Sequence, residues 1–415
     1  MDILISGASV AGPALALWLT RYGHRATVVE RAPALRDGGY AVDFRGEAHL
    51  TVLRRMGILD AVERHQTHMG AMWNVNEAGK KIVAMPADLF AGDVEILRGD
   101  LARILYDATE PTTEYVFGDS ITAVDQDADG VTVSFERSPA RRFDLVVGAD
   151  GLHSNVRSLA FGPEEDYLSY LGLYAAVFPI DNYLGLDHTG LTYNPPGKMV
   201  AIHSARGNTE ARAVFWFGSP PLDHDRHDVD RQRELLERAY EGVGWEVPEL
   251  MRRMRLTDDL YFDSISQIRL DSWSRGRVVL LGDAACCASP LSGMGTGLAV
   301  VSAYVLAGEL ASELAGAGGD HRAAFARYER EVRAYAEGCQ RSAVGVSRFM
   351  VPENRFMAWF MNQNYRLLPY LPWKGLMAKS VRKTASAISL KDYGAYEVTR
   401  PAGPAPRPRP SGRAS

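Results

Sequence analysis

The sequence predicts an α/β fold in which a Rossmann-like domain is interrupted by a mostly antiparallel β-sheet domain and followed by a C-terminal helical region. A strand, a glycine-containing turn, a helix and a second strand fit into about the first 30 residues, the size of a βαβ unit. The stretch 167–270 is aromatic and rich in strand patterns. Beyond it, a buried-strand pattern returns and leads into a second glycine turn and a long helix.

Composition supports a folded chain of ordinary character. The chain has 415 residues, of which 46% are hydrophobic and 23% charged, so we expect two or three globular domains. The formal net charge of -5 supplies no general field for binding nucleic acid or anionic lipid. We therefore expect no nucleic-acid partner.

The cysteines and the apolar runs indicate the compartment. Only three cysteines occur, two of them adjacent, which does not allow a disulfide framework or a zinc ribbon. The N-terminus lacks the basic region of a signal peptide, and no run reaches the 18 or so apolar residues of a spanning helix. We expect a cytoplasmic monomer or homodimer without a metal site or stable membrane insertion.

The first βαβ unit carries the features of a dinucleotide site. A strand over Asp2–Ser6 leads through a turn into a helix over Pro13–Tyr22. Gly7 lets the chain reverse tightly, and Gly12 lets the helix pack closely, so the helix N-terminus can face a pyrophosphate. Ser9 replaces the middle glycine of the usual pattern and is small enough to preserve the approach.

Glu30 closes the second strand, Ala26–Val29, about 20 residues after the turn. There a carboxylate accepts hydrogen bonds from ribose hydroxyls and repels a 2′-phosphate, which predicts an unphosphorylated ribose, as in FAD or NAD. The competing interpretation is an ordinary βα loop. The candidate residues of this site are Gly7, Ser9, Ala11, Gly12, Glu30 and Arg31.

Further elements follow from periodicity. We expect helices over 46–56 and 96–108, an alternating strand over 131–135 and a buried strand over 143–147. Strands of the inserted sheet are expected over 173–178, 198–203 and 213–217, and a returning buried strand over 277–281. Helices are expected over 298–314, 323–348 and 355–382.

Two further motifs follow predicted strands. The segment 150–157 reads Asp-Gly-Leu-His-Ser-Asn-Val-Arg, and Gly282-Asp283 precedes the second glycine turn, 293–297. In this order, after the N-terminal turn, they resemble the DGxxSxxR and GD motifs of the class A flavoprotein monooxygenases, the para-hydroxybenzoate hydroxylase family. The likeness is greatest to its tetracycline-inactivating and aromatic polyketide hydroxylase branch. The resemblance implies a GR2-type FAD-binding domain that uses FAD and NAD(P)H.

The resemblance also implies residue roles. Asp283 is similar to the residue that binds the ribityl chain, and the helix beginning near Gly297 should direct its positive end at the flavin N1–C2=O edge. Asp150 is similar to a family residue linked to FAD and to reduced nicotinamide, with Arg157 expected to brace it by an ion pair. The remaining FAD candidates are Arg45, Arg98, Pro290, Gly293, Gly295 and Thr296.

The family places its substrate between the flavin ring and the inserted sheet. His203 is a candidate to deprotonate or orient a phenol, although a structural histidine is the alternative. Aromatic residues at period two also pack sheets against their neighbours. The candidate pocket residues are Tyr193, His203, Phe215, Phe217 and Pro290.

Domain boundaries follow from these assignments. We expect an FAD-binding domain over 1–166 and 271–350, a substrate domain over 167–270, a bridging helix region over 351–400 and a disordered tail over 401–415. Membrane contact by 355–382 is the alternative to bridging, but two prolines interrupt its amphipathic face. Cys286 stands where the family often has histidine, and we interpret it and Cys287 as small packing groups.

The expected function is that of an FAD-dependent monooxygenase. It would take hydride from NAD(P)H, add O₂ to give a flavin C4a-hydroperoxide and hydroxylate a polycyclic aromatic or polyketide-like small molecule. One alternative is an FAD oxidoreductase of the same fold that performs redox or Baeyer–Villiger chemistry on an antibiotic. Another is a non-catalytic flavin- or ligand-binding protein.

Overall fold

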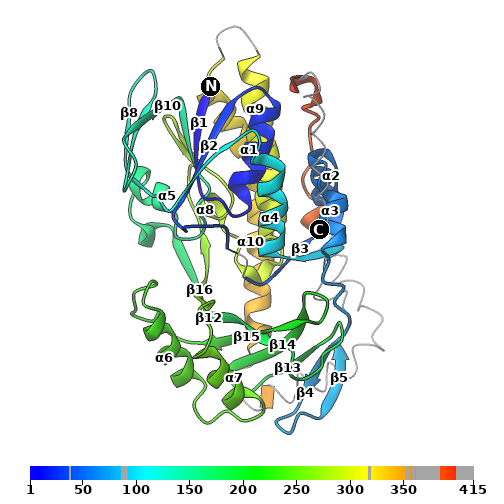
Figure 1. The fold of residues 1–415 in the computed structure, drawn as a ribbon. Helices are drawn as coiled ribbons and strands as arrows, with labels where there is room; N and C mark the ends of the chain where they lie inside the picture. The colour runs from blue at the N-terminus through cyan, green and yellow to red at the C-terminus, as the bar shows by residue number, and fades with distance from the viewer. Residues whose placement is uncertain are drawn as a thin grey trace, which may run out of the picture.

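The computed structural model describes residues 1–36, 39–85, 92–315, 319–351, 356–357, 360 and 384–398. Figure 1 shows two lobes, one built on a parallel sheet and the other on an antiparallel sheet. The predicted bridging region 351–400 lies largely outside the described residues, and the predicted tail 401–415 lies wholly outside them.

The first lobe is built on a six-stranded sheet that confirms the Rossmann-like prediction. β1 lies at its centre and pairs in parallel with β11 on one side and β2 on the other, with Ile5 opposite Val147 and Val28. Because all three strands are buried, they are continuous apolar runs. In order across the sheet, the strands are β17 (Ser274–Arg275), β18 (Val278–Leu280), β11 (Leu145–Gly148), β1 (Asp2–Ser6), β2 (Arg25–Glu30) and β7 (Glu114–Phe117).

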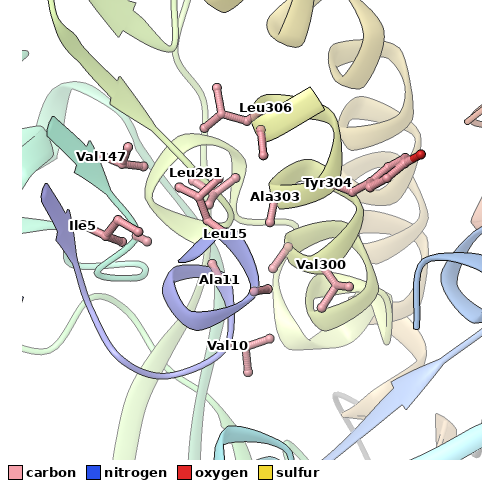
Figure 2. Close-up of a cluster of buried hydrophobic side chains, with 14 of the residues drawn as sticks. Ile5, Val10, Ala11, Leu15, Val147, Leu281, Val300, Ala303, Tyr304 and Leu306 are labelled. Atoms are coloured by element: carbon pink, nitrogen blue, oxygen red, sulfur yellow. The ribbon is translucent and has the colours of Figure 1, made fainter. Parts of the chain in front are cut away.

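Two helices pack together beside this sheet and form the core of the lobe. α1 (Ala11–Arg21) contacts α9 (Gly295–Leu314), and Figure 2 shows Leu15 and Ala11 of α1 between sheet residue Ile5 and Val300 of α9. α9 is apolar and long enough to cross a membrane, but 83% of its apolar window is buried inside the protein. It is therefore built as a core helix.

The second lobe contains a seven-stranded, mostly antiparallel sheet. α6 (Val229–Ala239) and α7 (Val247–Met254) cover one of its faces. In order, the strands are β16 (Tyr261–Ile268), β12 (Leu168–Asp181), β15 (Glu210–Gly218), β14 (Lys198–Ala205), β13 (Gly190–Tyr193), β4 (Met72–Val75) and β5 (Lys81–Met85). β4 and β5 precede residue 167, so the sheet draws on more of the chain than the predicted segment 167–270.

Two smaller sheets correct the element predictions. Residues Val94–Leu97 form β6, which pairs with β3 (Ala41–Phe44), so the helix expected over 96–108 begins only at α4 (Arg98–Thr109). The strand expected over 143–147 is divided at Asp144. β10 (Arg141–Phe143) pairs with β9 (Val131–Phe135), which pairs in turn with β8 (Ile121–Gln126), whereas β11 enters the parallel sheet. The sequence of this short segment does not reveal that the chain changes from one sheet to another at Asp144.

Short helices and one long helix complete the described fold. α10 (His321–Met350) packs on α9 at its start and reaches the antiparallel sheet, where Ala343 joins a cluster with Leu173 and Ile265. The described segment 384–398 returns to α9, where Tyr393 packs against Gly308. The short helices are α2 (Gly46–Met56), α3 (Leu59–Arg64), α5 (Asn155–Ala160) and α8 (Asp283–Cys286).

Candidate active site

The N-terminal turn brings α1 close to the ends of β1 and β11. Gly7 has φ of +106°, and a β-carbon there would lie 2.5 Å from the carbonyl oxygen of Ala149. A β-carbon on Gly12 would overlap the carbonyl oxygen of Gly7. The first turn of α1 has no side-chain cap and no acidic residue, so its free N–H groups are open to an anion.

Glu30 is fixed at the end of β2 beside this turn. Its Oε2 accepts a hydrogen bond from the Ala8 backbone N–H at 2.9 Å, and its Oε1 accepts one from the Ala32 N–H at 2.9 Å. Arg31 contacts His227 of the second lobe, Nη1 to Nε2, at 2.9 Å. Both lie at an open depression of about 550 Å³ lined by 31–36 and His227. The ribose contact expected of the Glu30 carboxylate stays a prediction.

Asp150 is held by its own loop and by Ser6 of β1, not by Arg157. Its carboxylate accepts hydrogen bonds from the Ser154 hydroxyl, from the Ser6 hydroxyl at 3.2 Å and from the Val156 N–H at 3.1 Å. Burial raises the pKa of Asp150 above its ordinary value.

The predicted ion pair between Arg157 and Asp150 is wrong. Arg157 is fully buried and pairs with Glu164 at 2.7 Å, and it also donates to the carbonyl oxygen of Leu152 at 2.7 Å. The carboxylate of Asp150 already has three donors, so the arginine is satisfied elsewhere.

His153, in the same segment, connects the two lobes. Its Nδ1 lies 2.8 Å from Glu164, and its Nε2 lies 3.1 Å from both carboxylate oxygens of Asp263 on β16. Burial opposes the charged form, but hydrogen bonds and charge from the two carboxylates raise the pKa of His153 to about 9. His153 is therefore an imidazolium at neutral pH. Its position in the sequence did not indicate this role.

Asp283 begins α8, and its carboxylate lies beside the second glycine turn, where α9 starts. A β-carbon on Gly295 would lie 3.8 Å from Asp283 Oδ1, and Gly293 has φ of +59°. The first turn of α9 has no side-chain cap and no acidic residue. Burial raises the pKa of Asp283, and the nearby charge of Arg98 opposes that shift. The structure thus brings together the carboxylate and the helix end that the sequence predicted.

The two candidate arginines differ in their relation to this turn. Arg45 pairs with Asp43, Nη2 to Oδ2, at 2.9 Å, and a β-carbon on Gly293 would lie 3.5 Å from its Nη2. Arg98 begins α4, where its backbone N–H donates to the Tyr40 carbonyl oxygen at 3.2 Å. Arg45 is thus adjacent to the glycine turn, and the Arg98 charge reaches Asp283.

A cavity of about 330 Å³ lies between the second glycine turn and the antiparallel sheet. Its lining contains the sequence candidates His203, Asp283, Pro290, Gly293, Gly295 and Thr296. Apolar and aromatic lining residues include Tyr40, Val42, Met69, Met72, Trp216 and Tyr261.

The matching family model, described as an FAD binding domain, covers residues 1–343. A flavin-dependent monooxygenase of Legionella longbeachae is 40% identical over 358 residues, which are 85% of this chain and 90% of that protein. The chain belongs to the class A flavin-dependent monooxygenases.

Solved structures support the same membership. The tetracycline destructase Tet(55) is 37% identical and superposes with a TM-score of 0.81 over 94% of this chain and 98% of its own. Tet(51) is 33% identical, with a TM-score of 0.82 over the same shares. HpxO of Klebsiella pneumoniae, solved with FAD and uric acid, shares 22% identity with a TM-score of 0.70, which shows the common fold.

The residues of this monooxygenase fit FAD. The N-termini of α1 and α9 have no side-chain cap, and each follows a glycine turn. A β-carbon in either turn would be crowded or strained. Glu30 lies beside the first helix end and Asp283 beside the second. Among the residues that the structure describes, no group of three histidine, cysteine or acidic side chains is placed to hold a metal ion. Cys286, Cys287 and Cys339 are free and buried, as packing groups are.

Two predicted pocket residues face away from the monooxygenase cavity. Phe215 and Phe217 are buried against Tyr240, with Phe215 at a ring distance of 4.9 Å, under the helices on the other face of the sheet. Val214 and Trp216 of the same strand line the cavity in their place. Alternation predicted that the two sets oppose each other but not which set faces the cavity.

Two other candidates have different surroundings. Tyr193 lies 5.7 Å from the Trp245 ring and is not among the residues that line the cavity. His203 does line it, and its Nε2 is buried without a hydrogen-bond partner among the described residues. Burial and the charge of Arg212 lower the pKa of His203 to about 4, so its ring is neutral.

His49 was not predicted, yet it supports the flavin end of α9. Its ring lies against Gly297, its Nδ1 accepts a hydrogen bond from the Arg45 backbone N–H at 2.9 Å, and its Nε2 hydrogen-bonds the Tyr335 hydroxyl. Burial and the charge of Arg45 lower the pKa of His49 to about 4. A helical histidine gives no sequence signal of such a role.

Proposed function

We propose that this monooxygenase uses NAD(P)H and O₂ to hydroxylate a polycyclic aromatic or polyketide-like small molecule. The observation that supports the proposal most directly is the 330 Å³ cavity between the N-terminus of α9 and the antiparallel sheet. The similarity to Tet(51) and Tet(55) favours a fused-ring substrate of the tetracycline kind. The proposed compartment is the cytoplasm, where reduced nicotinamide is supplied.

FAD, when bound, supplies the redox chemistry by accepting hydride and passing one oxygen atom of O₂ to the substrate. The chain supplies binding and orientation. The N-terminus of α1 would hold the pyrophosphate, Glu30 would accept hydrogen bonds from the ribose hydroxyls, and Asp283 would accept them from the ribityl chain. The positive end of α9 would favour negative charge on the bound cofactor.

The cavity walls position the substrate and exclude water. Aromatic and apolar side chains such as Trp216, Met72 and Pro290 bury the faces of a planar substrate, while the neutral His203 offers one polar contact. Exclusion of water favours oxygen transfer over unproductive loss of oxidant.

The test is substrate-stimulated oxidation of NADH and NADPH by the FAD-loaded protein with tetracyclines and aromatic polyketides. We expect at least one compound to accelerate the oxidation and to acquire one atom from ¹⁸O₂. Accelerated oxidation with no label in the product would favour an FAD oxidoreductase of the same fold. No stimulation by any fused-ring compound would reject the proposed substrate class.

A further inference from the structure

One wall of the cavity carries two carboxylic acids from neighbouring strands. Asp43 on β3 and Glu95 on β6 stand opposite each other in the antiparallel register, and both line the cavity. Neither residue belongs to a motif that the sequence analysis used. Cross-strand partners lie within about 5.5 Å of each other at the β-carbons, so their charges interact.

Asp43 is already committed to other groups. Its Oδ1 accepts a hydrogen bond from the Gly92 backbone N–H at 2.7 Å, and its Oδ2 pairs with Arg45 at 2.9 Å. Glu95 is only half committed, since the Thr67 hydroxyl donates to Oε1 and Oε2 has no partner among the described residues. Glu95 is therefore the acid of this pair with an acceptor available to a ligand.

The surroundings bring the titration of Glu95 close to neutral pH. Burial and the charge of Asp43 raise the pKa of Glu95 to about 7, against the opposing effects of Thr67 and Arg45. These are the groups that act on it. A small change of pH, or a change in the ligand beside it, therefore shifts the balance between the neutral and the anionic form of Glu95.

The cavity lining carries more acidic than basic groups, and Arg45 behind it is paired with Asp43. Among the described residues that line it, three carry a carboxyl group, Asp43, Glu95 and Asp283, and none is lysine or arginine. His203 is neutral. A ligand carboxylate would find no cation on these walls and would be repelled by Glu95 in its anionic form. The other lining residues are largely apolar, which favours a neutral ligand over a bare ammonium ion.

We propose that Glu95 determines substrate specificity by accepting a hydrogen bond from a phenolic or enolic hydroxyl of the substrate, and that it rejects substrates that bring a carboxylate to the same wall. This role rests on the proposed aromatic substrate class and refines it. The hydroxyl keeps its proton, so no bond is broken. The ionised carboxylate is the stronger acceptor, so affinity for the hydroxyl compound falls as the pH falls through about 7.

The test compares 2-naphthol, 2-methoxynaphthalene and 6-hydroxy-2-naphthoate as probes of the FAD-loaded protein. Dissociation constants come from the perturbation of flavin absorbance in the wild type, in Glu95→Gln and in the control Glu47→Gln, an exposed glutamate of α2. For 2-naphthol we expect Glu95→Gln to weaken binding about tenfold at pH 8. The methyl ether should be insensitive to the substitution, and the naphthoate should bind more tightly to the variant. Equal affinity of 2-naphthol for wild type and Glu95→Gln would overturn the role.

A second measurement needs no ligand. Infrared difference spectra of the FAD-loaded protein between pH 6 and 8 should contain the band of a protonated carboxyl group that is lost in Glu95→Gln and kept in Glu47→Gln. Asp43→Asn should move the titration to lower pH. Persistence of the band in Glu95→Gln would overturn the assignment. If the band behaves as expected but no probe binds to any variant, the selection role fails together with the aromatic substrate class.

Discussion

Gly297→Ala should disrupt the support of the flavin end of α9. A β-carbon there would lie closer than 3.0 Å to the Cε1, Nδ1 and Nε2 atoms of the His49 ring. Real β-carbons essentially never show contacts that short. The ring must move, which breaks its hydrogen bonds to the Arg45 N–H and the Tyr335 hydroxyl. Overpacking costs about 1–3 kcal/mol and each buried hydrogen bond about 1 kcal/mol, so we expect a loss of about 3–5 kcal/mol.

The assay is guanidinium unfolding of the FAD-loaded protein, followed by far-UV circular dichroism and by flavin release. A double-mutant cycle isolates the cause, because in a His49→Ala background the new methyl group meets no ring and should cost less than about 1 kcal/mol. Gly338→Ala is the matched control, because Gly338 also lies inside a helix, α10. Its new β-carbon would make an ordinary contact with Thr384 at 3.5 Å. That control should stabilise by about 0.5–1 kcal/mol. An equal cost of Gly297→Ala with and without the His49 ring would refute the reasoning.

Three further predictions concern other residues. Asp283→Ala should raise the dissociation constant of FAD about 10- to 100-fold with the fold intact, measured by fluorescence titration of the apoprotein, and unchanged flavin occupancy would contradict it. His153→Gln should lower the melting temperature most below pH 6.5. Because the folded pKa is raised to about 9, the contribution of His153 is complete below its unfolded pKa and is lost as the pH rises through about 9. A difference in melting temperature between wild type and variant that stays constant from pH 6 to 10 would argue against this role of His153. Gly308→Ala should displace the Tyr393 ring, which packs against that glycine, and expose segment 384–398 to proteolysis, while an unchanged cleavage pattern would count against the contact.

Local chemistry predicted much of the nucleotide-binding frame. Gly7, Gly12 and Glu30 lie within one βαβ unit, where the spacing of a few residues limits the possible geometry. Asp283 of the later Gly-Asp motif begins α8, and its carboxylate lies beside Gly295 at the start of α9. The positions of these residues follow from a turn and from the elements that directly flank it, and their roles toward FAD stay predictions.

The remaining features depend on contacts between distant segments. Glu95 meets Asp43 only because β6 pairs with β3, and the apolar pattern there was read as the start of a helix. Phe215 was assigned to the cavity instead of Trp216 because alternation gives two faces but not their partners. Arg157 was paired with Asp150 because the segment alone does not show that Glu164 lies nearer.

The length of α10 restricts how this molecule can open. At about 1.5 Å per residue its 30 residues form a rod of about 45 Å that packs on both lobes. Gln340 ties it further, donating to the Ile268 carbonyl oxygen at 2.8 Å while its own carbonyl oxygen accepts from Gln267 at 2.8 Å. Rotating one lobe against the other would leave these buried amides unpaired. A large ligand would then enter the cavity by displacement of loops and not by a hinge between two rigid lobes.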